Sequence, residues 1–201
     1  ELSQPELPGE KETTKIQESF QDYSLNELIN YQDSKRDIIN FIKKDEFEHL
    51  KATSASEKEL GLLTKRQING IKNVLADHFE RGSSIRKIEN DLKKLNLPER
   101  YISEDGKKIL QFSKEERPLA IARTESTRVT AGGTLENMEK RGVKHKLWIA
   151  ALQPGRTCPI CERLNGQMKE LNEDFIDEES GFKKLGPEAH TYCRCGMGAV
   201  D

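Results

Sequence analysis

All four cysteines of the chain lie between positions 158 and 195, and one of its four histidines lies among them. Cys158 and Cys161 form a C-x2-C pair, and His190, Cys193 and Cys195 follow as an H-x2-C-x-C cluster. The C-x2-C spacing allows both thiolates to face one tetrahedral ion while nearby backbone amides stabilise their charge. Because five donors exceed the four that a closed site needs, the pattern favours a structural zinc site over a catalytic one with an open position.

The spacing leaves several ligand sets open. The leading set is Cys158, Cys161 and His190 with either Cys193 or Cys195, and the alternative is a set of four cysteines with the histidine as a donor beside the site. In a reducing compartment such clustering favours a metal, whereas in an oxidising one two local disulfides, or free thiols, are the simpler interpretation. A redox-active C-x-x-C is a further alternative, although no βαβ context surrounds this pair.

Composition limits what the rest of the chain can be. Hydrophobic residues make up 34% of the sequence, which is lean for a large core and fits a two-part protein with polar helices. The 33 basic and 35 acidic side chains leave a net charge of -2, so no broad electrostatic surface for phosphates is predicted. No apolar stretch approaches the roughly 18 residues that span a bilayer, and residues 1–10 resemble no signal peptide, so we expect no membrane partner.

The sequence before the cluster has helical periodicity. Residues 1–14 combine proline, glycine and charge without such periodicity, which predicts a flexible lead-in. Within a helical arm over 15–55, apolar residues from 25 to 50 recur at helical spacings, which predicts one or two amphipathic helices, with Asp33 and Ser34 as a candidate break.

A helical subdomain with a short hairpin is predicted over 56–112. Thr64 and Gln67 form a capping-box pattern that begins a helix ending at Gly82, and Ser84 can cap a second helix that stops before Pro98. Apolar residues on both sides of an Asp-Gly dipeptide at 105–106 then predict a short hairpin or ordered loop.

The last predicted unit, 113–201, is a long helix followed by the Cys/His module. Ser113 and Glu116 form a second capping-box pattern, and Gly142 ends the helix, which the Gly-Gly pair at 132–133 is expected to weaken by roughly 1 kcal/mol per glycine. Residues 144–152 predict a strand centred on Trp148, a loop or small hairpin follows the C-x2-C pair, and 196–200 predict a final strand. The predicted fold class is therefore α+β, with a mostly α-helical N-terminal part followed by a small mixed module that carries the Cys/His cluster.

Outside the cluster, the clearest charged motif is the run Arg123-Thr124-Glu125 in the long helix. Its acid and base are two residues apart and therefore lie on different faces, so a contact with the following domain is the simplest interpretation. A partner contact or a catalytic carboxylate is the alternative. His49, His78 and His145 have no recognisable partner that would orient them as a base, and we assign them no role.

Several motifs together resemble a known family. In chain order they are a helix pair around Gly82-Ser83-Ser84-Ile85, the run Ile121-Ala122-Arg123-Thr124-Glu125, Trp148, the run Arg156-Thr157-Cys158-Pro159-Ile160-Cys161-Glu162-Arg163-Leu164-Asn165-Gly166, and His190 with Cys193-Arg194-Cys195. This combination resembles the phage Mu F-like minor head protein family, also called phage head morphogenesis proteins, over about residues 56–200. The family's A-R-T-E run falls on 122–125, its tryptophan on Trp148, and its C-x2-C and H-x2-C-R-C motifs on the five candidate ligands.

The resemblance implies a virion component inside the head, near the portal and present in few copies. It implies a part in head morphogenesis or in packaging and ejection of DNA, with portal, capsid or scaffold proteins as partners and contact with packaged DNA as a further expectation. Such a protein would occupy the host cytoplasm during assembly.

Two other functions stay open beside an assembly protein that binds and does not catalyse. A carrier module of a phage-delivered effector enzyme is one, although Glu125, Glu162 and Glu188 are general-base candidates only by default and we predict no catalytic residues. A zinc-dependent nucleic-acid-binding module is the other. Its phosphate contacts would come from basic residues around the cluster, namely Arg156, Arg163, Lys183, Lys184 and Arg194.

Overall fold

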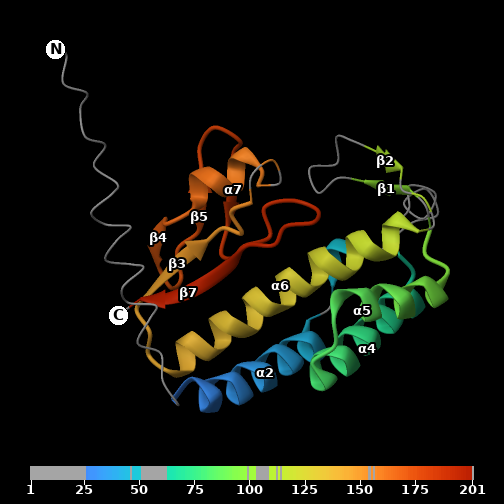
Figure 1. Ribbon diagram of the computed structural model, residues 1–201, viewed down its shortest axis with the longest axis horizontal. Coiled ribbons are helices and arrows are strands. Elements are labelled where there is room, and N and C mark those ends of the chain that lie inside the picture. Colours follow the sequence, from blue (N-terminus) through green and yellow to red (C-terminus); the bar gives the residue numbers. More distant parts are fainter. Residues whose placement is uncertain are drawn as a thin grey trace. The chain divides into compact units, whose positions relative to one another are not determined.

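The computed structural model describes residues 26–45, 47–50, 63–98, 100–102, 109–111, 113, 115–153, 155 and 157–200 (Figure 1). Internal contacts divide the chain into two units, Glu1–Asp33 and Ser34–Asp201, and the packing discussed below lies within the second unit. The predicted lead-in at 1–14, the boundary between 55 and 56, and the Asp-Gly turn at 105–106 lie outside the described residues. The predicted domain boundaries stay predictions.

Helices dominate the described chain up to residue 140, apart from one short pair of strands, and short antiparallel strands dominate after it. The helices are α2 (Asn26–Lys44), η1 (Glu48–Leu50), α4 (Lys65–Arg81), α5 (Ile85–Leu92), η2 (Lys93–Leu95), α6 (Glu116–Lys140) and α7 (Pro159–Leu164). The strands are β1 (Arg100–Ile102), β2 (Ile109–Gln111), β3 (His145–Ile149), β4 (Met168–Glu170), β5 (Phe175–Asp177), β6 (Phe182–Lys184) and β7 (Gly196–Val200). This order confirms the predicted α+β class, a mostly helical part followed by a small mixed module that carries the Cys/His cluster.

Local chemistry sets the ends of α4 and α5. The side chain of Thr64 accepts a hydrogen bond from the backbone N–H of Gln67, whose side chain accepts the N–H of Thr64, so the predicted capping box is confirmed. Gly82 ends α4 with φ 64°, a left-handed conformation that glycine adopts without steric cost. Ser84 lies at the predicted N-cap of α5, but its side chain makes no capping hydrogen bond.

The candidate break at Asp33 and Ser34 does not occur, because α2 continues through both residues to Lys44 as a single helix. Asp and Ser cost a helix interior only a fraction of a kcal/mol relative to better helix formers. Farther along α2, Ile38 and Ile42 are buried in the helical core, and packing of this kind outweighs weak local propensity.

One apolar core joins the helices. α5 contacts both α4 and α6, as Figure 1 shows, and α6 also contacts β7. The core is formed by the buried residues Ile38, Ile42, Phe47, Leu50, Leu63, Ile68, Ile71, Leu75, Ile88, Leu92, Ile121, Ala122 and Val129.

Helix α6 continues through its two glycines, and α2 packs against it at this point at close range. A Cβ atom on Gly133 would lie 2.5 Å from the Cα of Ile38, and one on Gly132 would lie 2.3 Å from the Cζ of Phe41. The glycines therefore do more than weaken the helix: Gly133 allows the two backbones to approach closely, and Gly132 makes room for the ring of Phe41. At the start of α6, Ser113 and Glu116 exchange the predicted capping-box hydrogen bonds.

The C-terminal module is built around β3, which lies between β4 and β7 in an antiparallel sheet of order β4-β3-β7. Trp148 on β3 is fully buried and contacts Phe175 and Phe182 edge-on, with ring centroids 5.2 and 5.7 Å apart. Phe175 and Phe182 lie on β5 and β6, which form the predicted small hairpin between the two halves of the Cys/His cluster. The aromatic residues thus form a second core, which includes Cys161, Cys193 and Cys195.

A buried lysine also holds this module together. The ammonium of Lys146 donates hydrogen bonds to the carbonyl oxygens of Leu171 and Leu185, both at 2.9 Å, and lies 5.1 Å from the centre of the Phe175 ring. Burial lowers the pKa of Lys146. Its side chain therefore ties β3 to the segments that follow β4 and β6.

We expect the substitution Gly133→Ala to destabilise the protein by about 1–3 kcal/mol, the usual cost of overpacking, because the new methyl group would overlap the backbone of Ile38. In an open helix the same change stabilises by roughly 1 kcal/mol, so the sign of the effect is diagnostic. Urea unfolding of the two proteins measures it. The matched control is Thr130→Ala at an exposed position of α6, which should not lower stability, and an unchanged or more stable Gly133→Ala protein would contradict the close crossing.

Candidate metal centre

The C-x2-C pair is presented by the first turn of α7. Cys158 is the N-cap residue, with extended backbone angles of φ -80° and ψ 153°, and Pro159 begins the helix where its missing N–H costs nothing. The backbone N–H of Cys161 donates to the Cys158 sulfur at 3.3 Å. This bond stabilises negative charge on that sulfur and directs both sulfurs to the same side of the turn.

The second half of the cluster lies in the loop that leads into β7. The N–H of Cys193 donates to the carbonyl oxygen of His190 at 3.0 Å, which closes a tight turn. Tyr192 within this turn has φ 67°, a left-handed conformation that is uncommon outside glycine. Cys195 follows immediately before Gly196, the first residue of β7.

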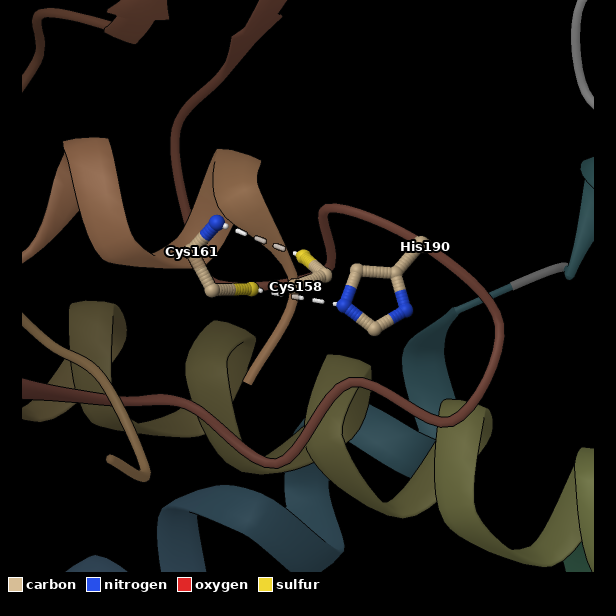
Figure 2. A group of neighbouring side chains, drawn as sticks. All are labelled: Cys158, Cys161 and His190. Atoms are coloured by element: carbon tan, nitrogen blue, oxygen red, sulfur yellow. Dashed lines mark hydrogen bonds between the residues drawn. The ribbon is translucent and has the colours of Figure 1, made fainter. Parts of the chain in front are cut away.

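The structure brings all five candidate donors together in two groups that share Cys161. Donor atoms of Cys158, Cys161 and His190 lie within 4.8 Å of one another (Figure 2), and so do those of Cys161, Cys193 and Cys195. Within these groups, the Cys161 sulfur is 3.3 Å from His190 Nε2 and 4.0 Å from the Cys193 sulfur. Cys161 is therefore the centre of the cluster.

The hydrogen bonds of His190 determine which ring nitrogen is available. Nδ1 lies 2.6 Å from the carbonyl oxygen of Thr191, which can only accept, so Nδ1 carries the proton. Nε2 then has a free lone pair and faces Cys161 (Figure 2). A histidine fixed in this tautomer by a backbone carbonyl is the usual arrangement of a metal ligand.

The thiols are crowded enough to affect one another's protonation. Hydrogen bonding with Cys193 and Cys195, together with burial, raises the pKa of Cys161. Hydrogen bonds from Cys161 and Cys193 outweigh burial and lower the pKa of Cys195. Without a cation the cluster must keep protons to limit its negative charge, whereas a bound dication would stabilise several thiolates at once.

The surroundings of Cys195 suit a thiolate. The backbone N–H of Ala151 and the indole N–H of Trp148 both lower the pKa of Cys195. Trp148 Nε1 is buried and finds no acceptor in ordinary hydrogen-bond geometry among the described residues. A buried donor beside a sulfur gains most when that sulfur is negatively charged, so these residues fit a metal-bound cysteine.

All four cysteines are free in this structure, and three of them are buried. The group therefore could hold a metal ion with donors supplied entirely by the protein. Four of these donors would fill a tetrahedral site and leave no coordination position open.

An ion pair fixes the helix that carries the C-x2-C pair. Arg163 of α7 donates from Nε and Nη2 to the two carboxylate oxygens of Asp177 on β5, both at 2.8 Å. Arg163, together with a hydrogen bond from Ser180, lowers the pKa of Asp177 well below its usual range. The bidentate geometry orients α7 against the β5–β6 hairpin.

We expect Asp177→Asn to lower the melting temperature at neutral pH, because Asn cannot accept both hydrogen bonds as a charged partner. Since the folded-state pKa of Asp177 is depressed, its contribution to stability is complete above its unfolded pKa of about 3.9 and is lost as the pH falls through the folded value. The difference in melting temperature should therefore be constant above about pH 5 and narrow below about pH 4. Melting curves with a chelator present remove any metal effect, and a difference that grows toward acidic pH would contradict this role.

The run Arg123-Thr124-Glu125 (the family-like run) lies on α6, between the Cys/His cluster and the helical core. Glu125 is 2% exposed, and its two carboxylate oxygens contact His49 Nε2 at 3.0 Å and Arg128 Nε at 2.8 Å. Arg128 also pairs with Asp45 and lies 4.3 Å from the centre of the Phe47 ring. Burial would raise the pKa of Glu125, but the hydrogen bond from His49 and the charge of Arg128 outweigh it and lower the pKa.

The other two residues of the run point elsewhere. Thr124 accepts a hydrogen bond from the backbone N–H of Tyr192 in the ligand loop, at 3.2 Å. Arg123 is partly buried, and its Nε finds no hydrogen-bond partner among the described residues. The run thus contacts the C-terminal module through Thr124 and the segment after α2 through Glu125.

Sequence reasoning missed the partners of Glu125. His49, assigned no role, is 76 residues away, and Asp45, which pairs with Arg128, is 83 residues from it. His78 likewise contacts Asp91 at 2.8 Å. No local spacing rule could have found the contacts to His49 and Asp45, because tertiary packing alone makes these residues neighbours.

The basic residues around the cluster are largely engaged by acidic or polar neighbours. Arg163 pairs with Asp177 and Glu179, Lys183 lies 3.9 Å from Asp174, and Lys184 lies 3.6 Å from Glu188. Arg194 donates to the side chain of Gln153, and residue 156 lies outside the described residues. These pairings reduce the positive charge available to phosphates and leave the nucleic-acid-binding hypothesis without specific support.

Fold and site together define a helical assembly joined to a small Cys/His module. The profile of the family described as Phage Mu protein F like protein matches residues 69–197, which include α5, α6 and the whole candidate metal centre. The chain therefore belongs to the phage Mu F-like family of phage head morphogenesis proteins, as the motifs predicted. No curated protein and no solved structure matches it.

Membership places the protein with the phage virion and implies interaction with other phage head proteins. None of the helices in the described part of the chain combines the length and the apolar character needed to cross a membrane.

Proposed function

We propose that this chain is a minor head protein that sits inside the phage head near the portal, and that it acts by binding during head morphogenesis or DNA packaging and ejection. The observation that carries the proposal is the family match, which extends from within α4 through α5 and α6 to the complete set of Cys/His motifs. In this proposal the outer faces of α2, α4 and α5 contact portal, capsid or scaffold proteins, because the apolar faces of these helices are already buried in the core and the outer faces remain for a partner. Contact with packaged DNA belongs to the same proposal.

The proposed role of the C-terminal module is that of a zinc-clamped unit. Cys158, Cys161 and His190 supply three ligands, and Cys193 or Cys195 supplies the fourth. Thiolate and imidazole donors in tetrahedral reach of one another favour zinc among the common divalent ions. Zinc would fasten α7 to the loop before β7 and so close a module whose own core is small.

We propose no enzymatic activity for this chain. The buried carboxylate of Glu125 is occupied by His49 and Arg128, which supports a structural role for the most prominent acid of the family-like run. The donors of the Cys/His cluster are sufficient to close a tetrahedral site without a substrate position. A hydrolase or transferase activity that disappears in Glu125→Ala would contradict this part of the proposal.

We expect about one zinc per purified chain and four free thiols after denaturation without reductant, because a closed site takes one ion. Elemental analysis with thiol titration measures both. Cys161→Ser should abolish zinc binding because Cys161 belongs to both donor groups, whereas only one of Cys193→Ser and Cys195→Ser should do so. Metal-free protein with fewer than four free thiols would mean that disulfides close the loop instead.

The location inside the head can be tested with intact phage particles. We expect the protein to resist added protease in intact heads and to be digested once the heads are opened, because the capsid shell excludes the protease. An abundant external capsid protein from the same particles serves as the digestion control. Digestion of this chain in intact heads would contradict an internal location.

A further inference from the structure

The loop that carries His190, Cys193 and Cys195 is fastened to α6 by two threonines. The backbone N–H of Tyr192 donates to Thr124 Oγ1 at 3.2 Å. The hydroxyl of Thr127 donates to the carbonyl oxygen of Cys193 at 2.7 Å. Thr124 and Thr127 are one helical turn apart on α6, so one face of this helix holds two consecutive residues of the ligand loop.

The loop needs such support because its backbone is held in an unfavourable conformation. Tyr192 has φ 67°, and a non-glycine residue in this region costs of the order of 1–3 kcal/mol. It lies between the last histidine and the last two cysteines, so its conformation sets the direction in which their side chains leave the loop. The hydrogen bonds from α6 act on Tyr192 itself and on the next residue.

The use of the Thr127 hydroxyl is also informative. Threonine within a helix commonly donates its hydroxyl to a carbonyl of the preceding turn of its own helix. Thr127 instead donates to Cys193, 66 residues away, through a bond that is partly buried. A buried tertiary hydrogen bond of this kind orients its acceptor as well as contributing to stability.

We propose that Thr124 and Thr127 are positioning residues of the metal centre, which hold the loop so that the donors of His190, Cys193 and Cys195 converge on Cys161. The inference rests on the proposed metal centre. It assigns a role to Thr124, a member of the family-like run, and adds Thr127, which no motif singled out. It also makes α6 a part of the metal centre although it supplies no ligand.

The test compares zinc affinity in the full chain carrying Thr124→Val, Thr127→Val, Thr127→Ser or Thr130→Val. Valine keeps the shape of threonine without its hydroxyl, serine keeps the hydroxyl, and Thr130 is exposed on the same helix. Loss of a partner outside the ligand set typically weakens metal binding 10- to 100-fold. Because these bonds act on the loop backbone, we expect zinc affinity to be about tenfold weaker in Thr124→Val and in Thr127→Val. Thr127→Ser and Thr130→Val should bind zinc as tightly as the unchanged protein.

Competition with a chelator measures the zinc affinities, and the absorption spectrum of the cobalt-loaded protein reports ligand geometry directly. A positioning role predicts altered cobalt bands in Thr127→Val and normal bands in Thr127→Ser. Circular dichroism of the metal-free variants shows whether each one folds. If Thr127→Val does not fold, the comparison of Thr124→Val with the unchanged protein tests the proposal.

The possible failures can be told apart. Equal zinc affinity and identical cobalt spectra in folded Thr124→Val, Thr127→Val and unchanged protein would overturn the role of the threonines and leave the metal centre standing. Absence of zinc binding by the unchanged protein, with no difference from Cys161→Ser, would overturn the metal centre and the inference with it.

Discussion

One stretch of helix α6, residues 124–128, holds the helical part and the Cys/His module together. Glu125 accepts a hydrogen bond from His49 and Arg128 pairs with Asp45, both in the segment between α2 and α4, while Thr124 contacts the loop before β7. Buried polar groups that lose their partners cost several kcal/mol when charged, so α6 cannot rotate or shift without leaving these groups unpaired. The position of this helix is therefore fixed from both sides.

The close crossing of α2 over α6 reinforces this arrangement. Gly133 lies against the backbone of Ile38 and Gly132 against the ring of Phe41, which fixes the depth at which α2 packs. Asp37 on α2 accepts hydrogen bonds from Asn137 and Lys140, one to two turns farther along α6. The apolar core between the helices is modest, and these specific contacts give the crossing a single register.

In the C-terminal module, the close packing of the cysteines limits how many of their thiols can ionise. Cysteines packed as closely as Cys161 and Cys193 cannot all ionise unless a cation compensates them, and they need protons or a disulfide otherwise. The backbone N–H that Cys161 donates to the Cys158 sulfur and the buried indole N–H of Trp148 beside Cys195 favour negative sulfur at this place, and His190 Nε2 offers its lone pair to a cation. Because the aromatic core around Trp148 is small, a clamp between α7 and β7 would contribute substantially to its stability.

Features that depend on near neighbours in the chain could be predicted from the sequence. It located both capping boxes, the glycine end of α4, strands β3 and β7, and the five donors, because caps, turns and C-x2-C spacings involve residues three or four apart. Three features could not be predicted from local patterns: α2 runs through Asp33 and Ser34, the α6 glycines lie against α2, and Glu125 contacts His49. These outcomes depend on groups that are distant in sequence, and packing selects them by burying one arrangement in which the charges are paired and the backbones fit.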